Sequence, residues 1–359
     1  MKKIFITCMA LAMTFLMQQE ANACTGITLT AKDSARIVAR TIEWGGSELN
    51  SQYVVVPRGY VQHSYVPGYT LDGMKMVARY GYVGLSVEQK EFVVEGLNEA
   101  GLSAGLFYFP GYGQYEAYNE AQKQQSVTDL QLVSWILGSC ANVEQVKEAV
   151  AKAHVIAIDR ASTVHWRFAD ASGRQIVLEI IDGKPCFYEN KLGVLTNSPG
   201  FEWQMTNLNN YVNLYAGTAE TKKMGDVQIA SFGAGSGFLG IPGDATPPSR
   251  FVRAAFYQAT APLQEKAEDA VRQSFQILNN FDIPIGVEFA DGKIPADIPS
   301  ATQWTTATDI TNKVIYYRTM YNSAIRRIDL SQIDFTRVAY QAVPLDKEKK
   351  QPFVPVCVK

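Results

Sequence analysis

The 359-residue sequence contains no apolar run that approaches the ~20 residues of a membrane-spanning helix. It also lacks a basic block, because 33 lysines and arginines are balanced by 35 aspartates and glutamates, giving a net charge of -2. Proteins that bind nucleic acid concentrate positive charge to neutralise phosphates. We therefore predict a folded protein without a membrane span and without a nucleic-acid partner.

Metal-binding patterns are also missing. The three histidines, His63, His154 and His165, are far apart and belong to no C-x-x-C or H-E-x-x-H pattern. Five cysteines are too few for a scaffold built on disulfides, and no pairing can be inferred from their spacing. We expect no metal and no cofactor. Each histidine is interpreted as an ordinary core or surface residue, with a Ser-His or Cys-His enzyme as the alternative.

The N-terminus has the pattern of a secretory signal peptide. Two lysines precede an almost wholly apolar run over residues 4–17, and Ala21-Asn22-Ala23 forms an A-x-A cleavage signal. We therefore expect residues 1–23 to be removed. Residues 24–359, which contain no linker-like segment in their interior, are predicted to form a single exported domain that is periplasmic or secreted.

Cleavage after Ala23 would make Cys24 the first residue of the mature chain. An α-amine has a reference pKa of about 7.7–8.0, so it can act as a general base at neutral pH. Since the thiol beside it is a strong nucleophile, one residue would supply both nucleophile and base. Two alternatives stay open: a buried or disulfide-bonded cysteine, and a lipid-anchored one. Lipoprotein signals normally carry a branched residue where this chain has Ala21.

Apolar spacing predicts an α+β fold. Period-two spacing predicts strands over residues 26–30, 36–40, 53–56, 75–83, 91–95, 102–107, 165–169 and 175–181, and a final hairpin over 313–321 and 324–329. Helical spacing predicts helices over residues 128–138, 142–153 and 264–279. Asn142 and Gln145 have the spacing of a capping box at the start of the second helix.

Several short blocks then follow one another along the chain. They are Cys24-Thr25-Gly26, Arg40-Thr41-Ile42-Glu43-Trp44, Gly96-Leu97-Asn98-Glu99-Ala100-Gly101-Leu102, Leu195-Thr196-Asn197-Ser198-Pro199-Gly200, Gly240-Ile241-Pro242-Gly243-Asp244, Pro248-Ser249-Arg250-Phe251 and Tyr316-Tyr317-Arg318. In this order they resemble the choloylglycine hydrolase and penicillin V acylase family of N-terminal-nucleophile hydrolases. The resemblance implies a four-layer αββα sandwich that hydrolyses a linear amide through an acyl-enzyme.

The resemblance also implies roles for individual residues. Cys24 would attack the amide carbonyl, and its α-amine would take the thiol proton and pass it to the leaving nitrogen. Arg40 would favour the thiolate, Arg250 would act electrostatically near the nucleophile, and the Asn197 side-chain amide would donate to the tetrahedral oxyanion.

Two positions depart from the family pattern. Glu43 stands where the family usually has the aspartate that holds the nucleophile's amine, so its carboxylate lies one methylene further out. The backbone N–H that serves as second oxyanion donor falls on Phe107, where bile-salt enzymes carry asparagine and penicillin acylases carry tyrosine. The side chain at this position therefore does not indicate the substrate.

Four aromatic residues could line an apolar substrate pocket, with core packing as the alternative: Trp44, Tyr108, Phe109 and Tyr112. The expected substrate is a small-molecule amide, a conjugated bile salt first, with penicillin V or another N-acyl amide as alternatives. A more distant alternative is a non-catalytic, lipid-anchored binding protein of the same fold. Members of the family often form homotetramers, and residues 211–232 have the length of the segment that helps to hold them together.

Overall fold

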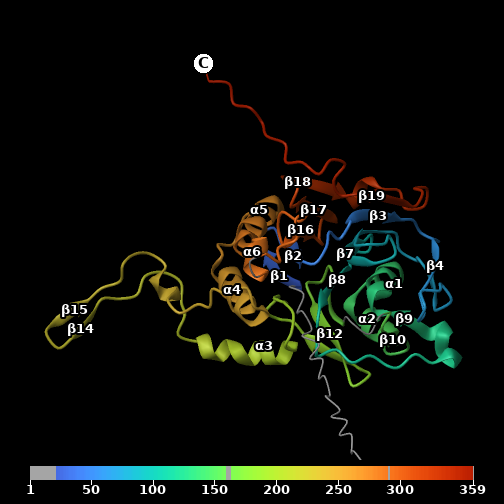
Figure 1. Ribbon diagram of the computed structural model, residues 1–359, viewed down its shortest axis with the longest axis horizontal. Helices are drawn as coiled ribbons and strands as arrows, with labels where there is room; N and C mark the ends of the chain where they lie inside the picture. Colours follow the sequence, from blue (N-terminus) through green and yellow to red (C-terminus); the bar gives the residue numbers. More distant parts are fainter. Residues whose placement is uncertain (1–21, 159–162, 290–291, 359) are drawn as a thin grey trace, which may run out of the picture.

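The computed structural model describes residues 22–158, 163–289 and 292–358, and two antiparallel sheets form its centre (Figure 1). The smaller sheet has five strands, in the order β1, β2, β16, β17 and β18. These strands are β1 (Asn22–Thr30), β2 (Arg36–Trp44), β16 (Thr302–Asp309), β17 (Val314–Thr319) and β18 (Asn322–Asp329). The predicted N-terminal and C-terminal hairpins are thus confirmed, and both belong to this sheet.

The larger sheet has eight strands. In spatial order they are β13 (Lys184–Glu189), β12 (Gln175–Ile181), β11 (Val164–Ala169), β8 (Ser103–Tyr108), β7 (Val93–Asn98), β6 (Tyr82–Ser86), β3 (Gln52–Val56) and β19 (Gln341–Pro344). Strands β6, β7, β8, β11 and β12 are almost wholly buried, because a helical layer covers one face and the other sheet covers the opposite face. Such strands show less period-two alternation than half-exposed ones.

Helices cover the outer face of each sheet (Figure 1). Helix α1 (Leu132–Ser139) packs on β7 and β8, and α2 (Val143–Val150) on β11. On the other side, α4 (Pro247–Thr260) packs on β1, and α5 (Ala267–Leu278) on β1, β2 and β16. Shorter helices are α3 (Phe201–Asn207) and α6 (Ile285–Glu288). The order of layers is the αββα sandwich that the sequence blocks imply.

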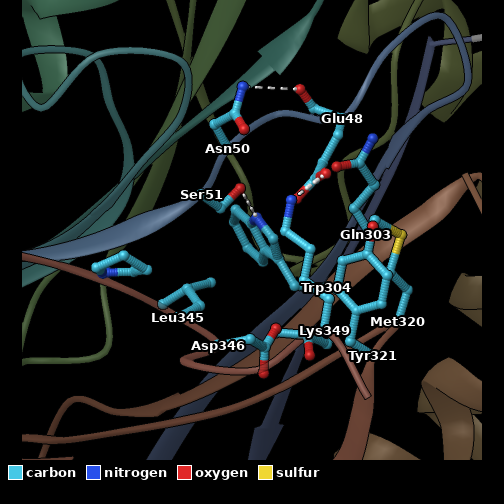
Figure 2. Close-up of a pocket in the computed structure, with 12 residues that line it drawn as sticks. Glu48, Asn50, Ser51, Gln303, Trp304, Met320, Tyr321, Leu345, Asp346 and Lys349 are labelled. Carbon is cyan, nitrogen blue, oxygen red and sulfur yellow. Dashed lines mark hydrogen bonds and ion pairs between the residues drawn. The ribbon is translucent and has the colours of Figure 1, made fainter. Parts of the chain in front are cut away.

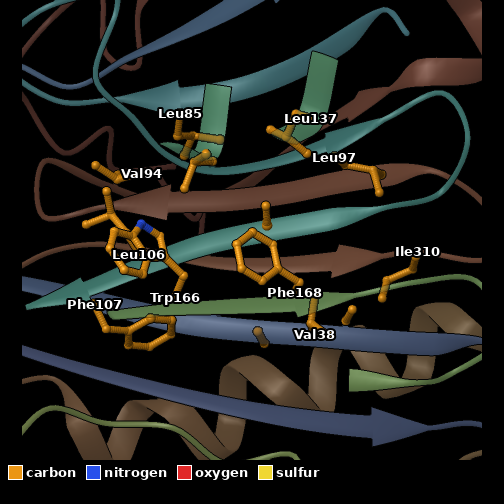
Figure 3. Close-up of a cluster of buried hydrophobic side chains, with 14 of the residues drawn as sticks. Val38, Leu85, Val94, Leu97, Leu106, Phe107, Leu137, Trp166, Phe168 and Ile310 are labelled. Carbon is orange, nitrogen blue, oxygen red and sulfur yellow. The ribbon is translucent and has the colours of Figure 1, made fainter. Parts of the chain in front are cut away.

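The apolar core lies between the two sheets and under the helices. Val38 of β2, Trp166 and Phe168 of β11, and Leu137 of α1 belong to one buried cluster (Figure 3). Burying a side chain of this size contributes about 1.5–3 kcal/mol. The two sheets are therefore held at a fixed separation, which fixes the side chains that point between them.

Three two-stranded sheets lie outside the sandwich. They pair β4 (Val61–His63) with β5 (Lys75–Val77), β9 (Ser126–Thr128) with β10 (His154–Ile156), and β14 (Lys222–Met224) with β15 (Val227–Ile229). The last pair forms a hairpin that projects far from the sandwich (Figure 1). In the described part of the chain, no helix combines the length and the hydropathy that a membrane span requires.

One predicted strand is wrong. Residues 75–83 form two strands, because β5 ends at Val77 and β6 begins at Tyr82. The intervening chain turns so that the backbone N–H groups of Arg79 and Tyr80 both donate to the Gly138 carbonyl. The apolar pattern continues through this turn, so period alone does not reveal it.

One helix start was predicted from its cap, whereas α1 and α5 begin a few residues after the predicted positions 128 and 264. The Asn142 side chain accepts a hydrogen bond from the Gln145 backbone N–H at 3.0 Å, as the capping pattern predicts. Helix α2 begins at Val143, directly after Asn142. By contrast, helix α4 is absent from the sequence prediction. Its first two residues are Pro247 and Pro248, which suit the first turn of a helix because that turn needs no backbone donors.

Candidate active site

Cys24 lies near the start of β1 and is 4% exposed. Its sulfur accepts a hydrogen bond from Arg40 Nη2 at 2.7 Å and another from the Tyr108 backbone N–H. Burial raises the pKa of the Cys24 thiol, and the positive charges of Arg40 and Arg250 oppose this effect only in part. The thiol therefore needs a base to remove its proton.

Arg40 is fully buried between the two sheets. Besides the Cys24 sulfur, the guanidinium donates to the Leu106 carbonyl at 2.5 Å and to the Thr41 carbonyl at 3.1 Å. The Phe107 ring lies under it, with 4.0 Å from Arg40 Cζ to the ring centroid. The positive charge is thus fixed in position beside the Cys24 sulfur, as the sequence blocks imply.

Asn197 follows a short antiparallel contact that joins Leu195 to Gly26 of β1. Its Oδ1 accepts from the Cys24 backbone nitrogen at 2.8 Å, and its Nδ2 donates to the Tyr108 carbonyl at 2.7 Å. A carboxamide nitrogen carries two N–H groups, so the second one is available to another acceptor. Asn197 therefore connects the Cys24 backbone nitrogen to β8 on the other side of the site.

Arg250 extends from α4 into the same cluster and is fully buried. Nη1 donates to the Cys24 carbonyl at 2.5 Å and to Thr25 Oγ1 at 2.9 Å, while Nη2 donates to Asn197 Oδ1 at 2.7 Å. Burial lowers the pKa of Arg250, and the nearby Glu43 and Cys24 oppose that shift. Arg250 thus holds the Cys24 backbone in position as well as adding charge beside it.

Glu43 lies on β2 directly opposite Ala23 and is 1% exposed. Its Oε1 accepts from Thr302 Oγ1 at 3.2 Å, and the Thr41 side chain also forms a hydrogen bond with the carboxyl. Burial raises the pKa of Glu43 to about 8, against the opposing charge of Arg250. Within the described chain, Oε2 has no hydrogen-bond partner. The carboxyl can therefore change its protonation near neutral pH.

The backbone donor beside the sulfur is on Tyr108, one residue after the predicted Phe107. Phe107 pairs with His165 of β11, and its ring packs under Arg40. Successive N–H groups of a strand point in opposite directions, so a one-residue shift decides which donor faces the site. The Phe107 assignment is therefore corrected to Tyr108.

The four aromatic residues predicted for the substrate pocket form two pairs, Trp44 with Tyr108 and Phe109 with Tyr112, with ring centroids 6.2 and 5.8 Å apart. Trp44 is partly buried and packs edge-on against Tyr108, with ring centroids 6.2 Å apart. Phe109 is fully buried and stacks on His165, so it belongs to the interior. Tyr112 is 48% exposed at the surface. Of the four, only Tyr108 contacts the thiol, through its backbone N–H.

Sequence reasoning missed a buried ion-pair network behind Arg40. Arg167 Nη2 donates to Glu95 Oε1 at 2.5 Å, and Glu95 Oε2 lies 3.7 Å from Arg40 Nη1. Glu95 packs against Gly105, where a Cβ would lie only 2.2 Å from the carboxylate. The available signal was a single charged residue inside each of two apolar strands, β7 and β11. Such charges are rarely buried unless they are paired.

A second carboxyl, Glu288 of α6, also faces this region. Burial raises its pKa to about 7, with the charge of Arg250 opposing the shift, and its charge in turn raises the pKa of Glu43. No motif in the sequence marks Glu288, which lies at the end of the short helix α6.

A cavity of about 310 Å³ lies behind the site, and Cys24 is not among the residues that line it. Trp304 forms part of its wall, and the indole N–H donates to Ser51 Oγ at 3.0 Å (Figure 2). Arg40 Cζ lies 5.7 Å from the Trp304 ring centroid. The indole therefore belongs both to the cavity and to the surroundings of Arg40.

Comparison with known proteins agrees with this geometry. Residues 24–343 match the linear amide C–N hydrolases, choloylglycine hydrolase family, and the chain belongs to this family. It is therefore a hydrolase of linear amide bonds, and it has the N-terminal-nucleophile hydrolase fold.

Individual relatives share most of the chain. A bile salt hydrolase/transferase of Clostridium perfringens is 30% identical over 318 residues, which cover 86% of this chain and 93% of the relative. The crystal structure of a variant conjugated bile acid hydrolase from that organism has a TM-score of 0.78 at 27% identity, covering 93% of this chain and all of the other. A penicillin V acylase structure from Agrobacterium tumefaciens has a TM-score of 0.71 at 24% identity, with 90% and 92% covered, and shares the fold.

Proposed function

We propose that this protein is an exported cysteine amidohydrolase that cleaves conjugated bile salts through an acyl-enzyme on an N-terminal Cys24. The observation that carries the proposal is the surroundings of the Cys24 sulfur, which accepts from both Arg40 and the Tyr108 backbone N–H. The Asn197 side chain also accepts a hydrogen bond from the Cys24 nitrogen. These are the contacts that a nucleophile and its oxyanion site require.

The proposal requires cleavage after Ala23. Cleavage would turn the Cys24 nitrogen, which donates to Asn197 Oδ1, into an α-amine that Asn197 already orients. Because Ala23 pairs with Glu43, its removal would also uncover the Glu43 carboxyl beside the new amine. The carboxylate would then hold the amine in place, which is the role of the aspartate in the family.

The proposed reaction has two steps. The α-amine takes the thiol proton while the sulfur attacks the amide carbon, and the carbonyl oxygen becomes an oxyanion. The Tyr108 backbone N–H and the second N–H of Asn197 Nδ2 would bind that oxyanion. Collapse breaks the C–N bond, the leaving amine takes the proton, and a thioester remains. Water then attacks the thioester with the α-amine as base, which releases the acid and restores the thiol.

The bile-salt preference follows from the relatives, whose names state that activity. The alternative is penicillin V, because the corrected donor position carries Tyr108 and the family's penicillin acylases carry tyrosine there. The test is kcat/KM for the mature protein on a glycine-conjugated bile salt and on penicillin V, measured side by side. A bile-salt value at least tenfold higher supports the proposal. A higher value for penicillin V would assign the chain to the acylases, and cleavage of neither substrate would contradict both assignments.

Export and the state of Cys24 have their own test. Intact mass of the purified protein should show a chain that begins with an unmodified Cys24 in the periplasmic or secreted fraction. A mass increased by a diacylglycerol and an acyl chain would instead identify a lipid-anchored protein, whose acylated amine could not act as the base.

We further propose that the protein forms a homotetramer through the hairpin of β14 and β15 (Figure 1). This hairpin and the chain that follows it expose Met224, Val227, Ile229 and Phe232 to solvent. Exposed apolar groups gathered on one projecting segment are typical of a contact with another chain. A second copy of this chain would cover them.

A further inference from the structure

His165, on β11, lies between two acceptors. It is fully buried. Its Nδ1 is 3.1 Å from Glu179 Oε1, and its Nε2 is 3.0 Å from the Thr196 carbonyl oxygen. The sequence indicated only an ordinary histidine at this position, and nothing in the catalytic cluster touches its ring nitrogens.

The contact with Thr196 fixes one proton on the ring. A backbone carbonyl only accepts hydrogen bonds, so Nε2 must carry a proton. A neutral imidazole has one N–H, so Nδ1 would then present a lone pair to the Glu179 carboxylate. Glu179 Oε1 also accepts from the Phe201 backbone N–H at 2.8 Å, which favours the ionised carboxylate. All three contacts are satisfied when Nε2 carries a proton and one further proton lies between Nδ1 and the Glu179 carboxyl.

The ring lies behind both oxyanion donors. Phe109 stacks on it, with centroids 4.3 Å apart and planes 7° apart, and Phe107 packs edge-on at 6.2 Å. These two residues flank Tyr108 in the sequence. On its other side the ring holds the carbonyl of Thr196, the residue before Asn197. His165 therefore contacts a sequence neighbour of each proposed donor, Phe109 next to Tyr108 and Thr196 next to Asn197.

We infer that His165, hydrogen-bonded to Glu179 and to the Thr196 carbonyl, is a positioning residue that fixes the Tyr108 and Asn197 donors in register with the Cys24 sulfur. It acts through these neighbours and touches no substrate. The inference rests on the proposed function, because it assigns those donors to the oxyanion. Because an oxyanion forms only after attack, loss of the pair should affect the chemical step more than substrate binding.

The kinetic test uses the full mature protein with two substitutions. His165→Phe keeps the stacking on Phe109 but removes both hydrogen bonds, and Glu179→Gln keeps the size of the side chain but removes its charge. We expect each to lower kcat by roughly 10- to 100-fold, with KM changed less than about twofold, because displacements of about 1 Å cost up to ~100-fold. His154→Gln breaks a similar histidine–glutamate pair, with Glu116 near the surface, and should leave both constants unchanged.

A second measurement does not depend on how well the variants fold. In protein labelled with ¹⁵N-histidine, the His165 signal can be assigned by its persistence in His63→Gln and His154→Gln. We expect Nε2 to carry a proton, as its contact with the Thr196 carbonyl requires, and an unprotonated Nε2 would overturn the inference. Unchanged kcat in both variants, or a loss confined to KM, would also overturn it. If wild-type protein hydrolyses no amide, the proposed function fails, whereas the ¹⁵N signal still decides the state of the pair.

Discussion

Ala23 lies directly opposite Glu43 in the pairing of β1 with β2. The residue expected to leave with the signal peptide therefore covers the carboxyl that would hold the new α-amine. Ala23 itself packs in a small apolar cluster with Ile283 and Ala301. Removal of Ala23 would thus create the amine and the space around it in one step.

The length of Glu43 is the first testable feature. Thr302 Oγ1 reaches Glu43 Oε1 at 3.2 Å, so the surrounding structure already accommodates the extra methylene. Glu43→Asp would withdraw the carboxylate by about 1.5 Å, one carbon–carbon bond. We expect kcat to fall by roughly 10- to 100-fold. Steady-state kinetics of the mature variant check this, and an increase in kcat would show that the longer side chain is a handicap.

Glu43 also makes stability depend on pH while Ala23 is present. Its pKa is about 8 in the folded chain, against about 4.3 when unfolded. Between these values the folded state holds a proton that the unfolded state has lost, so stability should fall as pH rises from about 4.3 to 8. Glu43→Gln removes this contribution.

Urea unfolding of the Ala23-containing chain measures the effect. We compare the free energy of unfolding of the wild type with that of Glu43→Gln. The wild-type value minus the variant value should be lower at pH 8 than at pH 5. An equal difference at both pH values would mean that Glu43 is ionised in the folded chain.

The ion-pair network behind Arg40 predicts a large loss of stability. Burial raises the pKa of Glu95, and Arg167 and Arg40 oppose that shift. Glu95→Gln would leave the two guanidinium groups without their carboxylate, and breaking a buried pair costs about 3–5 kcal/mol. The control is Glu48→Gln, which breaks a surface pair with Lys349 and should cost less than about 1 kcal/mol. Equal unfolding midpoints for the two variants would contradict the proposed support of Arg40.

The projecting hairpin predicts the result of an assembly experiment. Phe232→Asp should convert the tetramer to smaller species in light scattering after size-exclusion chromatography. Phe353→Asp is the control, because Phe353 is also exposed but lies on the C-terminal segment, away from the hairpin. A wild-type monomer, or a Phe232→Asp variant that stays tetrameric, would count against assembly through this hairpin.

Much of the fold follows from local patterns. The Asn142 cap and the hairpin of β1 and β2 depend on residues close in sequence, and both were predictable. The strand β16 was not, although it joins β2 to β17 at the centre of its sheet. Its eight residues include four threonines and are all buried, so no alternation between polar and apolar side chains marks it.

Some residues of the site could likewise be predicted from the sequence, and others could not. Cys24 and Asn197 lie in blocks that the sequence shows, and they meet through a hydrogen bond. Thr302, Glu95 and Glu179 reach the site from distant strands, so only the packing of the two sheets reveals them. The Phe107 assignment failed by one residue because a side-chain pattern does not show which way a backbone N–H points.

The central claim is that a free α-amine on Cys24 is the catalytic base. It is tested by comparing kcat/KM on a glycine-conjugated bile salt for protein that begins at Cys24 and for protein that retains Ala23, with both N-termini confirmed by intact mass. Because general-base catalysis typically contributes 10²–10⁴-fold, we predict a value at least about 100-fold higher for the protein that begins at Cys24. Cys24→Ala should be inactive in either form. Equal activity of the two proteins would contradict the account.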